Sequence, residues 1–350
     1  MPGASSPRHA FCLALLRMGF TELPASPREL VVSYTTVSPL PAEASGLFSV
    51  ALACGFPRVD VIHHPALRSP DFPRGVEHAT RSSRPTRPGI NPTLVRMLIL
   101  LPPSESKTAP SAGPSVDLSD MSFPQLTEAR EAMLDRLIEV SSGEDSGDLL
   151  KTGPSLAAEV ERNTRLLREP TAPALEVYTG VLFDALDHPH LSPKAQERAR
   201  TRVVIISALW GAVTPADFIP AYRLSMGAKV APAGTLAAWW KAELGPVLDA
   251  HGSGQVIVDC RSSSYAAAWK APAERTVGIR VERELNGKRQ VVSHMAKHYR
   301  GEVARILLEA EVEPQSVDDV VEILRPHWQV ELESDGTKGH SLTLVVPSDG

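Results

Sequence analysis

The stretch Ile206-Ser-Ala-Leu-Trp-Gly-Ala-Val-Thr-Pro-Ala-Asp-Phe-Ile-Pro-Ala-Tyr-Arg-Leu-Ser-Met-Gly227 is the most informative part of this 350-residue sequence. It begins at the end of an apolar run, passes through a loop interrupted by glycine and proline, and ends on Tyr222-Arg223 beside Met226-Gly227. In open α/β sheets, ligands bind in the loops that follow the carboxyl ends of strands. The stretch therefore predicts a buried strand and, at its end, a functional site.

Two other short runs resemble the one that ends at Ile206, and the three predict the centre of a sheet. They are continuous, apolar and rich in β-branched residues, as expected for strands buried on both faces, and they cover residues 98–101, 203–206 and 256–258. Helical patterns lie between and around them, at residues 123–141, 155–167, 192–202 and 236–250. Ser122 and Thr235 are placed as helix caps. We expect the last helix to break or kink at Gly245-Pro246 and to end at Gly252.

The last third of the chain contains two predicted hairpins. Residues 276–285 and 288–293 flank Asn286-Gly287, a pair that favours the positive φ angles of a two-residue hairpin turn. Residues 329–332 and 342–346 form a second, closing hairpin.

Two helices are predicted between these hairpins, at residues 294–310 and 317–324. The spacing of the first gives one apolar stripe, made of Met295, Tyr299, Val303, Ile306 and Leu307. Lys297 and Arg300 share a different face of that helix. Together the elements predict an α/β (mixed α+β) fold in which helices surround a mixed β-sheet.

Residues 1–96 differ in composition from the rest of the chain. They contain ten arginines and no lysine, six acidic residues and 13 of the 31 prolines. Such breaker-rich sequence buries too little apolar surface to offset the entropy lost on ordering. We interpret residues 1–96 as a disordered arm or as upstream sequence translated from a start codon assigned too early, with Met97 as the functional start. Residues 97–350 are then expected to form a single domain.

The charge of residues 97–350 is unevenly distributed. This part of the chain has 26 basic and 35 acidic residues, a net charge of −9, which is not the balance of an obvious nucleic-acid-binding domain. Residues 270–305 are the exception, because they hold nine Lys or Arg and four Glu. The local charge indicates either a solvated hairpin and helix face or a basic binding surface.

Several protein classes are excluded or disfavoured. Cys12, Cys54 and Cys260 lie far apart and form no disulfide framework or zinc spacing, which fits a reducing cytoplasm. No apolar run reaches the roughly 18 residues of a membrane span. The Walker, Gly-x-Gly-x-x-Gly, Gly-x-Ser-x-Gly and His-Glu-x-x-His motifs are missing. We expect a monomeric cytoplasmic protein without membrane contact or cofactor, and we favour a binding role over an enzymatic one.

The three predicted central strands each end in a loop of small hydroxyl residues. Ser104 and Lys107 follow the first strand, Ser207 follows the second, and Arg261 follows the third, just before Ser264 and Tyr265. Hydroxyls, loop N–H groups and a cation together suit a phosphate. The alternative is that these serines serve only as helix caps.

Arg223 and Tyr178 are further candidates for the same site. Arg223 follows the extended backbone after Pro220, where it could bind phosphate or stack on a base while Tyr222 or Trp210 offers a ring. The alternative is that Arg223 is buried against an internal carboxylate such as Asp217. Tyr178 lies at a predicted helix start and could donate its hydroxyl to the cleft or merely pack.

Two histidine pairs have spacings that can hold a metal. His294 and His298 lie four residues apart on a predicted helix, and His188 and His190 flank Pro189. Lys297 adjoins the first pair, and neither pair has a glutamate placed as in a metallopeptidase. We therefore expect no metal site.

The order of several segments resembles that of the bacterial YaaA peroxide-stress family. Besides residues 206–227, the resemblance rests on Leu98-Ile-Leu-Leu-Pro-Pro-Ser-Glu-Ser-Lys-Thr108, Val177-Tyr-Thr-Gly180, Val256-Ile-Val-Asp-Cys-Arg-Ser-Ser-Ser-Tyr265 and Ser293-His-Met-Ala-Lys-His-Tyr-Arg-Gly301. It covers residues 97 to about 346. It implies a cytoplasmic factor that limits unincorporated intracellular iron, with a YaaA-like α/β fold and a basic cleft that binds DNA.

The resemblance has two departures that bear on the cleft. The family's helix-hairpin-helix-like element would fall at residues 149–167, which contain Gly153-Pro154 but no Gly-hydrophobic-Gly hairpin. His298 stands where the family has a second basic residue, so the cleft gains charge only below the usual histidine pKa of ~6.5.

Three hypotheses follow from the sequence. In the first, Lys107, Arg223, Lys297 and Arg300 neutralise phosphates of DNA without regard to its base sequence, while Ser104, Ser264 and Tyr265 position them. In the second, the protein is a nucleic-acid or nucleotide-processing enzyme that uses Lys107 as an amine nucleophile, with a pKa lowered by cationic neighbours. In the third, the histidine pair binds iron.

Overall fold

The computed structural model describes most of the chain after residue 96, namely residues 97–231, 234–285, 288–292, 295–336 and 339–347. The expectations for residues 1–96 and for the Asn286-Gly287 turn lie outside the described residues.

Three parallel strands form the centre of the sheet, as the sequence predicts. β1 (Met97–Leu101) lies between β3 (Val203–Ser207) and β6 (Val256–Asp259), with Ile99 opposite Val203 on one side and Val258 on the other. All five residues of β1 and of β3 are buried, since helices cover both faces of a central parallel sheet. The carboxyl ends of the three strands therefore meet at one edge.

The complete sheet is mixed, which confirms the predicted fold class. Its order is β4-β3-β1-β6-β7-β10-β9, and β8 pairs with β7 off this path. The predicted hairpins are present: β7 pairs antiparallel with β8, and β9 with β10. In addition, β10 pairs parallel with β7, which joins the closing hairpin to the central strands. The bounds of the strands outside the centre are Gly211–Val213 for β4, Thr276–Leu285 for β7, Lys288–Val291 for β8, Gln329–Asp335 for β9 and Gly339–Pro347 for β10.

The Trp210-Gly211 step lets the chain turn back from β3 into β4. Gly211 has a φ of 71°, and a β-carbon there would lie 2.6 Å from the Trp240 ring. The Trp240 indole N–H donates to the carbonyl of Ala208 at 2.8 Å. Glycine is therefore required at this position both for the left-handed backbone and for the close approach of the ring.

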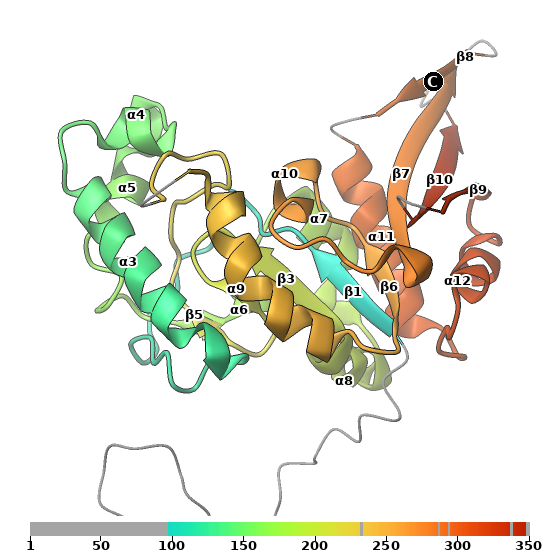
Figure 1. The fold of residues 1–350 in the computed structure, drawn as a ribbon, viewed down its shortest axis with the longest axis horizontal. Helices are drawn as coiled ribbons and strands as arrows, with labels where there is room; N and C mark the ends of the chain where they lie inside the picture. Colours follow the sequence, from blue (N-terminus) through green and yellow to red (C-terminus); the bar gives the residue numbers. More distant parts are fainter. Residues whose placement is uncertain (1–96, 232–233, 286–287, 293–294, 337–338, 348–350) are drawn as a thin grey trace, which may run out of the picture. The chain divides into compact units, whose positions relative to one another are not determined.

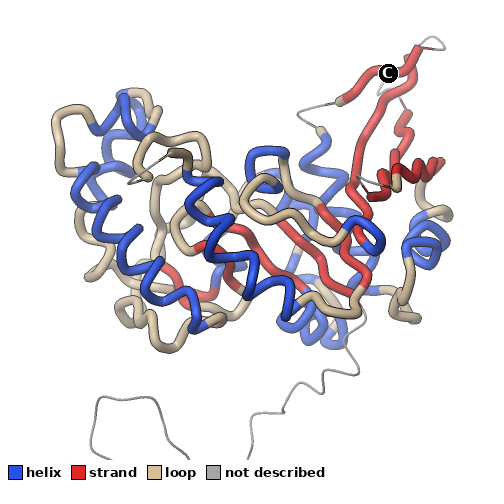
Figure 2. The backbone as a smooth tube through the Cα atoms, in the orientation of Figure 1, coloured by secondary structure: helices blue, strands red, loops and turns tan. Residues whose placement is uncertain are grey.

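Helices pack around the strands (Figures 1 and 2). In Figure 1, α9 crosses in front of β3, and α7 and α11 lie together next to the central strands. The main helices are α3 (Thr127–Ser141), α8 (Pro193–Arg202), α9 (Leu236–His251), α11 (Ala296–Glu309) and α12 (Val317–Leu324). The shorter ones are α4 (Ser146–Leu150), α5 (Ala157–Asn163), α6 (Ala174–Val177), α7 (Val181–Leu186) and α10 (Ser263–Ala266). Short 3₁₀ turns and a small second sheet complete the fold: η3 (Pro124–Leu126), η4 (Pro154–Leu156), η5 (His188–His190), η6 (Ala273–Arg275), β2 (Ala172–Pro173) and β5 (Phe218–Ile219).

The predicted helix ends are correct where the capping residue acts on its own helix. They are wrong where its side chain bonds a residue distant in sequence instead. Ser192 and Thr235 cap α8 and α9 through their side chains, as such residues do at helix starts. Ser122 does not cap a helix, because its hydroxyl bonds Thr214 at 3.0 Å and η3 precedes α3. The predicted helix over 155–167 is shorter than expected and ends as α5 at Asn163, whose side chain bonds the backbone of Arg223.

Two further predictions about helices need correction. We expected a break or a kink at Gly245-Pro246, and the break is wrong, because α9 continues through both residues. Its buried residues Leu236, Trp240, Leu244 and Leu248 recur every fourth position, and this stripe holds the helix against the sheet despite the missing proline N–H.

The apolar stripe of α11 is also partly misplaced. Val303 and Leu307 are fully buried, but Met295 is 39% exposed, and Tyr299 and Ile306 are only partly buried. Gly301 packs closely against α7, and the buried face of α11 accordingly includes Ala304 and Leu308 beside Val303 and Leu307.

Candidate functional site

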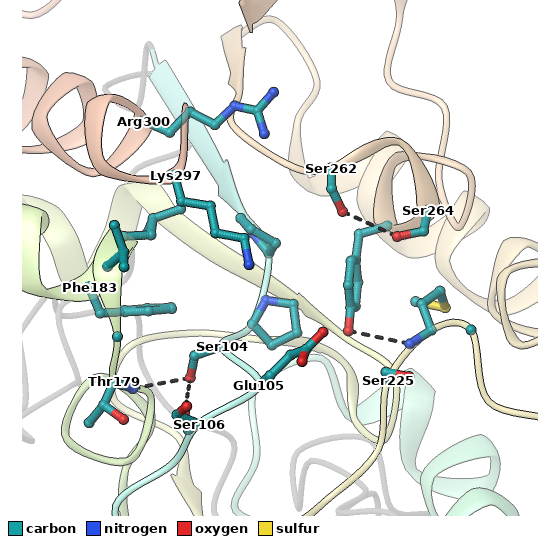
Figure 3. Close-up of a pocket in the computed structure, with 18 residues that line it drawn as sticks. Ser104, Glu105, Ser106, Thr179, Phe183, Ser225, Ser262, Ser264, Lys297 and Arg300 are labelled. Carbon is teal, nitrogen blue, oxygen red and sulfur yellow. Dashed lines mark hydrogen bonds between the residues drawn. The ribbon is translucent and has the colours of Figure 1, made fainter. Parts of the chain in front are cut away.

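A cavity of about 530 Å³ lies where the loops after β1 and β6 meet the first turns of α7 and α11 (Figure 3). Its lining comes from five segments of the chain. These are residues 102–106, 179–183 and 225–227, then Ser262, Ser264 and Tyr265, then Lys297 and Arg300. The cavity therefore brings together five predicted site residues: Ser104, Ser264, Tyr265, Lys297 and Arg300.

The loop after β3 does not reach this cavity. Ser207, Ala208, Leu209 and Trp210 are fully buried. The Ser207 hydroxyl accepts from the backbone N–H groups of Leu209 and Trp210 at 3.1 and 3.0 Å, so it closes its own turn. Only two of the three predicted loops thus converge on the cavity.

Ser104 ties the loop after β1 to the start of α7. Its Oγ accepts from the Thr179 N–H at 3.1 Å and donates to the Ser106 carbonyl. The Thr108 N–H donates to the Val177 carbonyl at 2.9 Å, and Lys107 forms an isolated bridge with Tyr178. Residues 104 and 179, which lie far apart in sequence, are thereby fixed as one wall of the cavity.

Lys297 and Arg300 supply the positive charge of the cavity from the first turns of α11. Lys297 is exposed, forms no ion pair with any described residue, and points toward the loop of Ser104 in Figure 3. Arg300 is partly buried, and its Nε and Nη2 donate to the Ile279 carbonyl at 3.2 and 3.0 Å. Those bonds hold the Arg300 guanidinium at the cavity.

Tyr265 and Ser264 form the opposite wall. The Met226 N–H donates to the Tyr265 hydroxyl at 3.4 Å, and Ser262 and Ser264 hydroxyls lie 3.2 Å apart. Burial raises the pKa of Tyr265 well above its usual value, so its hydroxyl stays protonated at neutral pH. This wall therefore offers neutral hydrogen-bonding groups.

Lys107 lies in a buried network next to the cavity rather than in its lining. Its Nζ donates to the Ser104 carbonyl at 2.7 Å and lies 4.2 Å from the centre of the Tyr222 ring. The Tyr222 hydroxyl bonds those of Tyr178 and Ser207 at 2.9 and 2.7 Å. Burial first and the charge of Arg223 second lower the pKa of Lys107 to about 7. The predicted lowering of the Lys107 pKa is thus confirmed, although burial contributes more to it than the charge of Arg223 does.

Arg223 and Arg261 do not line the cavity, and both pair with carboxylates. The Arg223 side chain is 14% exposed and pairs with Glu105 at 3.4 Å and Glu159 at 3.7 Å. Its suggested partner Asp217 is wrong, because that carboxylate accepts the N–H groups of Ser122 and Thr214, each at 2.7 Å. Arg261 is buried and pairs with Asp259 at 2.7 Å.

The histidine pairs are not assembled into a metal site in the described residues. No group of three or more His, Cys, Asp or Glu side chains there could hold a metal ion. His298 lies 3.5 Å from Glu302, and His190 bonds Asp187 at 2.6 Å. His294 lies outside the described residues.

The candidate helix-hairpin-helix region contains two short helices, α4 and α5. Lys151 follows α4 in a left-handed conformation with a φ of 55°, and η4 begins at Pro154 and leads into α5. The region therefore joins two helices by a short connection in which lysine, not glycine, takes the positive φ angle.

Sequence reasoning missed Phe183, Thr179 and Ser225 as cavity residues. Thr179 and Ser225 lie inside segments that carry the family resemblance, so the resemblance could have identified them as cavity residues. Phe183 lies one turn into α7 and stacks on Tyr178 with ring centres 5.5 Å apart. Nothing in the local sequence distinguishes it from a core phenylalanine.

Comparison with known proteins gives consistent matches over the described part of the chain. The family described as "Peroxide stress protein YaaA" matches residues 97–333. A UPF0246 protein of Streptomyces coelicolor is 41% identical over 256 residues, which are 71% of this chain and 98% of that protein. A UPF0246 protein of Corynebacterium efficiens is 42% identical over 253 residues, 71% of this chain and all of that protein.

More distant relatives match a similar length of this chain. UPF0246 proteins of Burkholderia mallei are 27% identical over 240 residues, 64% of this chain and 90% of theirs. No helix in the described residues is long and apolar enough to cross a membrane. From the matched family and the two closer relatives, this chain belongs to the peroxide stress protein YaaA (UPF0246) family.

Proposed function

We propose that this protein acts in the cytoplasm during peroxide stress by binding DNA at the described cavity, and that it thereby contributes to limiting unincorporated iron and oxidative damage. The observation that carries the proposal is the Lys297 ammonium, which pairs with no described residue and lies beside Arg300 on the same cavity as the Ser264 hydroxyl. Cations with adjacent hydroxyl donors are the groups that proteins place on phosphate oxygens.

The other predicted site residues have supporting roles in this proposal. Arg223 pairs with Glu105 of the cavity lining, and Lys107 donates a hydrogen bond that holds the Ser104 carbonyl in place. Arg261 fixes Asp259 at the end of β6, and Tyr178 anchors Tyr222. Because Glu105 is exposed and negative, phosphates are expected on the Lys297 side of the cavity and not on the Glu105 side.

The Lys297→Ala, Arg300→Gln double variant is expected to bind duplex DNA about 10-fold to 100-fold more weakly than wild type, because charge-assisted contacts contribute more than neutral ones. The slope of log K against log salt should become less negative by about 0.9 for each lost contact. Fluorescence anisotropy with a labelled duplex at several salt concentrations measures both quantities. In cells, the same variant should restrict unincorporated iron less well under peroxide.

A matched control has the same change in charge at residues that do not line the cavity. Lys241 on α9 and Arg325, which directly follows α12, are exposed, so Lys241→Ala with Arg325→Gln should leave the affinity and the salt slope close to wild type. Lys297→Ala alone tests the site with little effect on folding, because its side chain has no described partner. Equal affinity of the cavity variant and the control would refute the proposal.

An enzymatic function is the second candidate, favoured by the lowered pKa of Lys107. An amine with a pKa of about 7 is largely neutral at slightly alkaline pH and can attack a carbonyl carbon. On abasic DNA, Lys107 Nζ would add to the deoxyribose aldehyde carbon, and loss of water would leave an imine. To do so, Nζ must leave the Ser104 carbonyl, 2.7 Å away, and enter the cavity.

Borohydride, which reduces an imine to a stable amine, separates these two functions. If Lys107 reacts, the yield of protein joined to abasic DNA should rise as pH increases through about 7 and should vanish in Lys107→Met. Because Arg223 lowers the pKa of Lys107, Arg223→Gln should shift that midpoint to higher pH. A wild-type protein that binds abasic DNA without forming this product has the binding function alone.

A further inference from the structure

The volume of the cavity is larger than binding to backbone phosphates requires. Phosphates on a duplex are reached by cations on an open surface or in a groove. The cavity of about 530 Å³ instead falls within the size range of sites for small organic ligands. The cavity therefore has room for a small group, such as one nucleotide, which is either part of a DNA duplex or free in solution.

The inner lining of the cavity is partly aromatic and apolar. Phe183 stacks on Tyr178, whose ring is nearly parallel to it at an interplanar angle of 24°. Leu182 and Met226 also contribute, and Val181 is 37% exposed at the same place. Aromatic rings are the surfaces on which proteins stack nucleic-acid bases.

Polar groups beside this apolar surface are available for hydrogen bonds. The hydroxyls of Thr179 and Ser225 form no hydrogen bond with another described residue, and the Glu105 carboxylate can accept from an amino group. Figure 3 shows Thr179 and Phe183 on one side of the cavity, with Ser225 and Ser264 on the other. The cations Lys297 and Arg300 lie together on α11. This is the chemical arrangement of a nucleotide site: anion-binding groups, a ring to stack on, and donors and acceptors for a base edge.

We propose that the cavity receives a single nucleotide that has left the base stack of DNA, with its base against Phe183 and its phosphate on Lys297 and Arg300. This inference rests on the proposed DNA-binding function and specifies which part of the DNA enters the protein. Extrusion requires unpairing and unstacking, which cost least at a mismatched base. The site should therefore favour DNA that contains a mismatch.

The test compares binding of the full-length protein to a paired duplex, the same duplex with one mismatch, and the same duplex with one abasic site. We expect about tenfold tighter binding to the mismatch than to the paired duplex, because extrusion there costs less. The abasic duplex should bind more weakly than the mismatch, since it has no base to stack. A 2-aminopurine at the mismatch should become more fluorescent on binding.

Two neighbouring serines of α10 provide a matched pair of variants. Ser264 lines the cavity and Ser263 does not, and both are exposed, so a phenylalanine at either position leaves the core intact. Ser264→Phe should fill the cavity and abolish the mismatch preference, so that paired and mismatched duplex bind this variant equally. Ser263→Phe should keep the preference, and thermal unfolding confirms that both variants fold.

The outcomes distinguish this inference from the proposed function. Equal binding to paired and mismatched duplex, with both weakened by Lys297→Ala, overturns the extruded nucleotide and leaves DNA binding intact. No binding to any duplex overturns both. Tight binding of free deoxyadenosine monophosphate without any mismatch preference would identify a free nucleotide as the ligand and would likewise overturn extrusion.

Discussion

Replacing Arg130 with methionine is expected to destabilise the protein by about 3–5 kcal/mol, the cost of removing one partner from a buried charged network. Arg130 is fully buried on α3, and its guanidinium donates to the carbonyls of Trp210 at 3.0 Å, Ser122 at 2.8 Å and Ala212 at 2.7 Å. The variant would leave two buried acceptors and one partly buried acceptor without this donor, and each unsatisfied buried group costs about 1–3 kcal/mol.

The positive charge of Arg130 also interacts with the negative charge of Asp217. Burial lowers the pKa of Arg130 to about 10, and the nearby Asp217 opposes that shift, so the guanidinium remains charged at neutral pH. Removing it leaves the buried Asp217 carboxylate without this cation. The midpoint and slope of urea unfolding give the free-energy change.

Arg136→Met is the matched control for Arg130→Met. Arg136 lies on the same helix, is 35% exposed and pairs with Glu139 at 2.7 Å. Loss of such a surface pair should cost at most about 1 kcal/mol. If the two variants unfold at the same urea concentration, Arg130 does not hold α3 to the loop between β3 and β4.

The framework of this fold follows from local sequence because its signals are local. The strand at residues 98–101 is a continuous apolar run, and such a run predicts a strand that is buried on both faces. Ser192 and Thr235 act within one helical turn of themselves. The antiparallel pairing of β7 with β8 needs only two neighbouring strands and a short turn. Each of these features depends on residues fewer than about ten positions apart.

The site depends on contacts that local sequence does not encode. Arg223 could be recognised as a functional or buried arginine, but its carboxylate partners Glu105 and Glu159 lie in two distant segments. The sequence suggests Arg261 as a phosphate ligand, but in the structure its guanidinium pairs with the nearby Asp259 carboxylate. Phe183 enters the cavity because α7 packs beside α11, a consequence of tertiary structure. The family resemblance supplied the segments of the cavity, and the packing decides which side chains enter it.

Replacing Gly301 with alanine is expected to destabilise the protein by about 3 kcal/mol and to weaken DNA binding as well. A β-carbon at residue 301 would lie 2.1 Å from the Leu182 carbonyl oxygen and 2.8 Å from the Ala185 β-carbon. Because the nearest atom belongs to backbone, it cannot turn away as a flexible side chain could, and overpacking of this kind costs about 1–3 kcal/mol or more. The helices α7 and α11 must move apart.

That movement links packing to function, since α7 carries Phe183 and α11 carries Lys297 and Arg300. Gly245→Ala is the matched control: Gly245 lies within α9 with no atom within 4 Å of an added β-carbon, so alanine should stabilise the helix by about 0.5–1 kcal/mol. Urea unfolding and DNA titration of both variants test the link. If Gly301→Ala lowers stability without lowering DNA affinity, the distance between α7 and α11 does not determine how the cavity binds DNA.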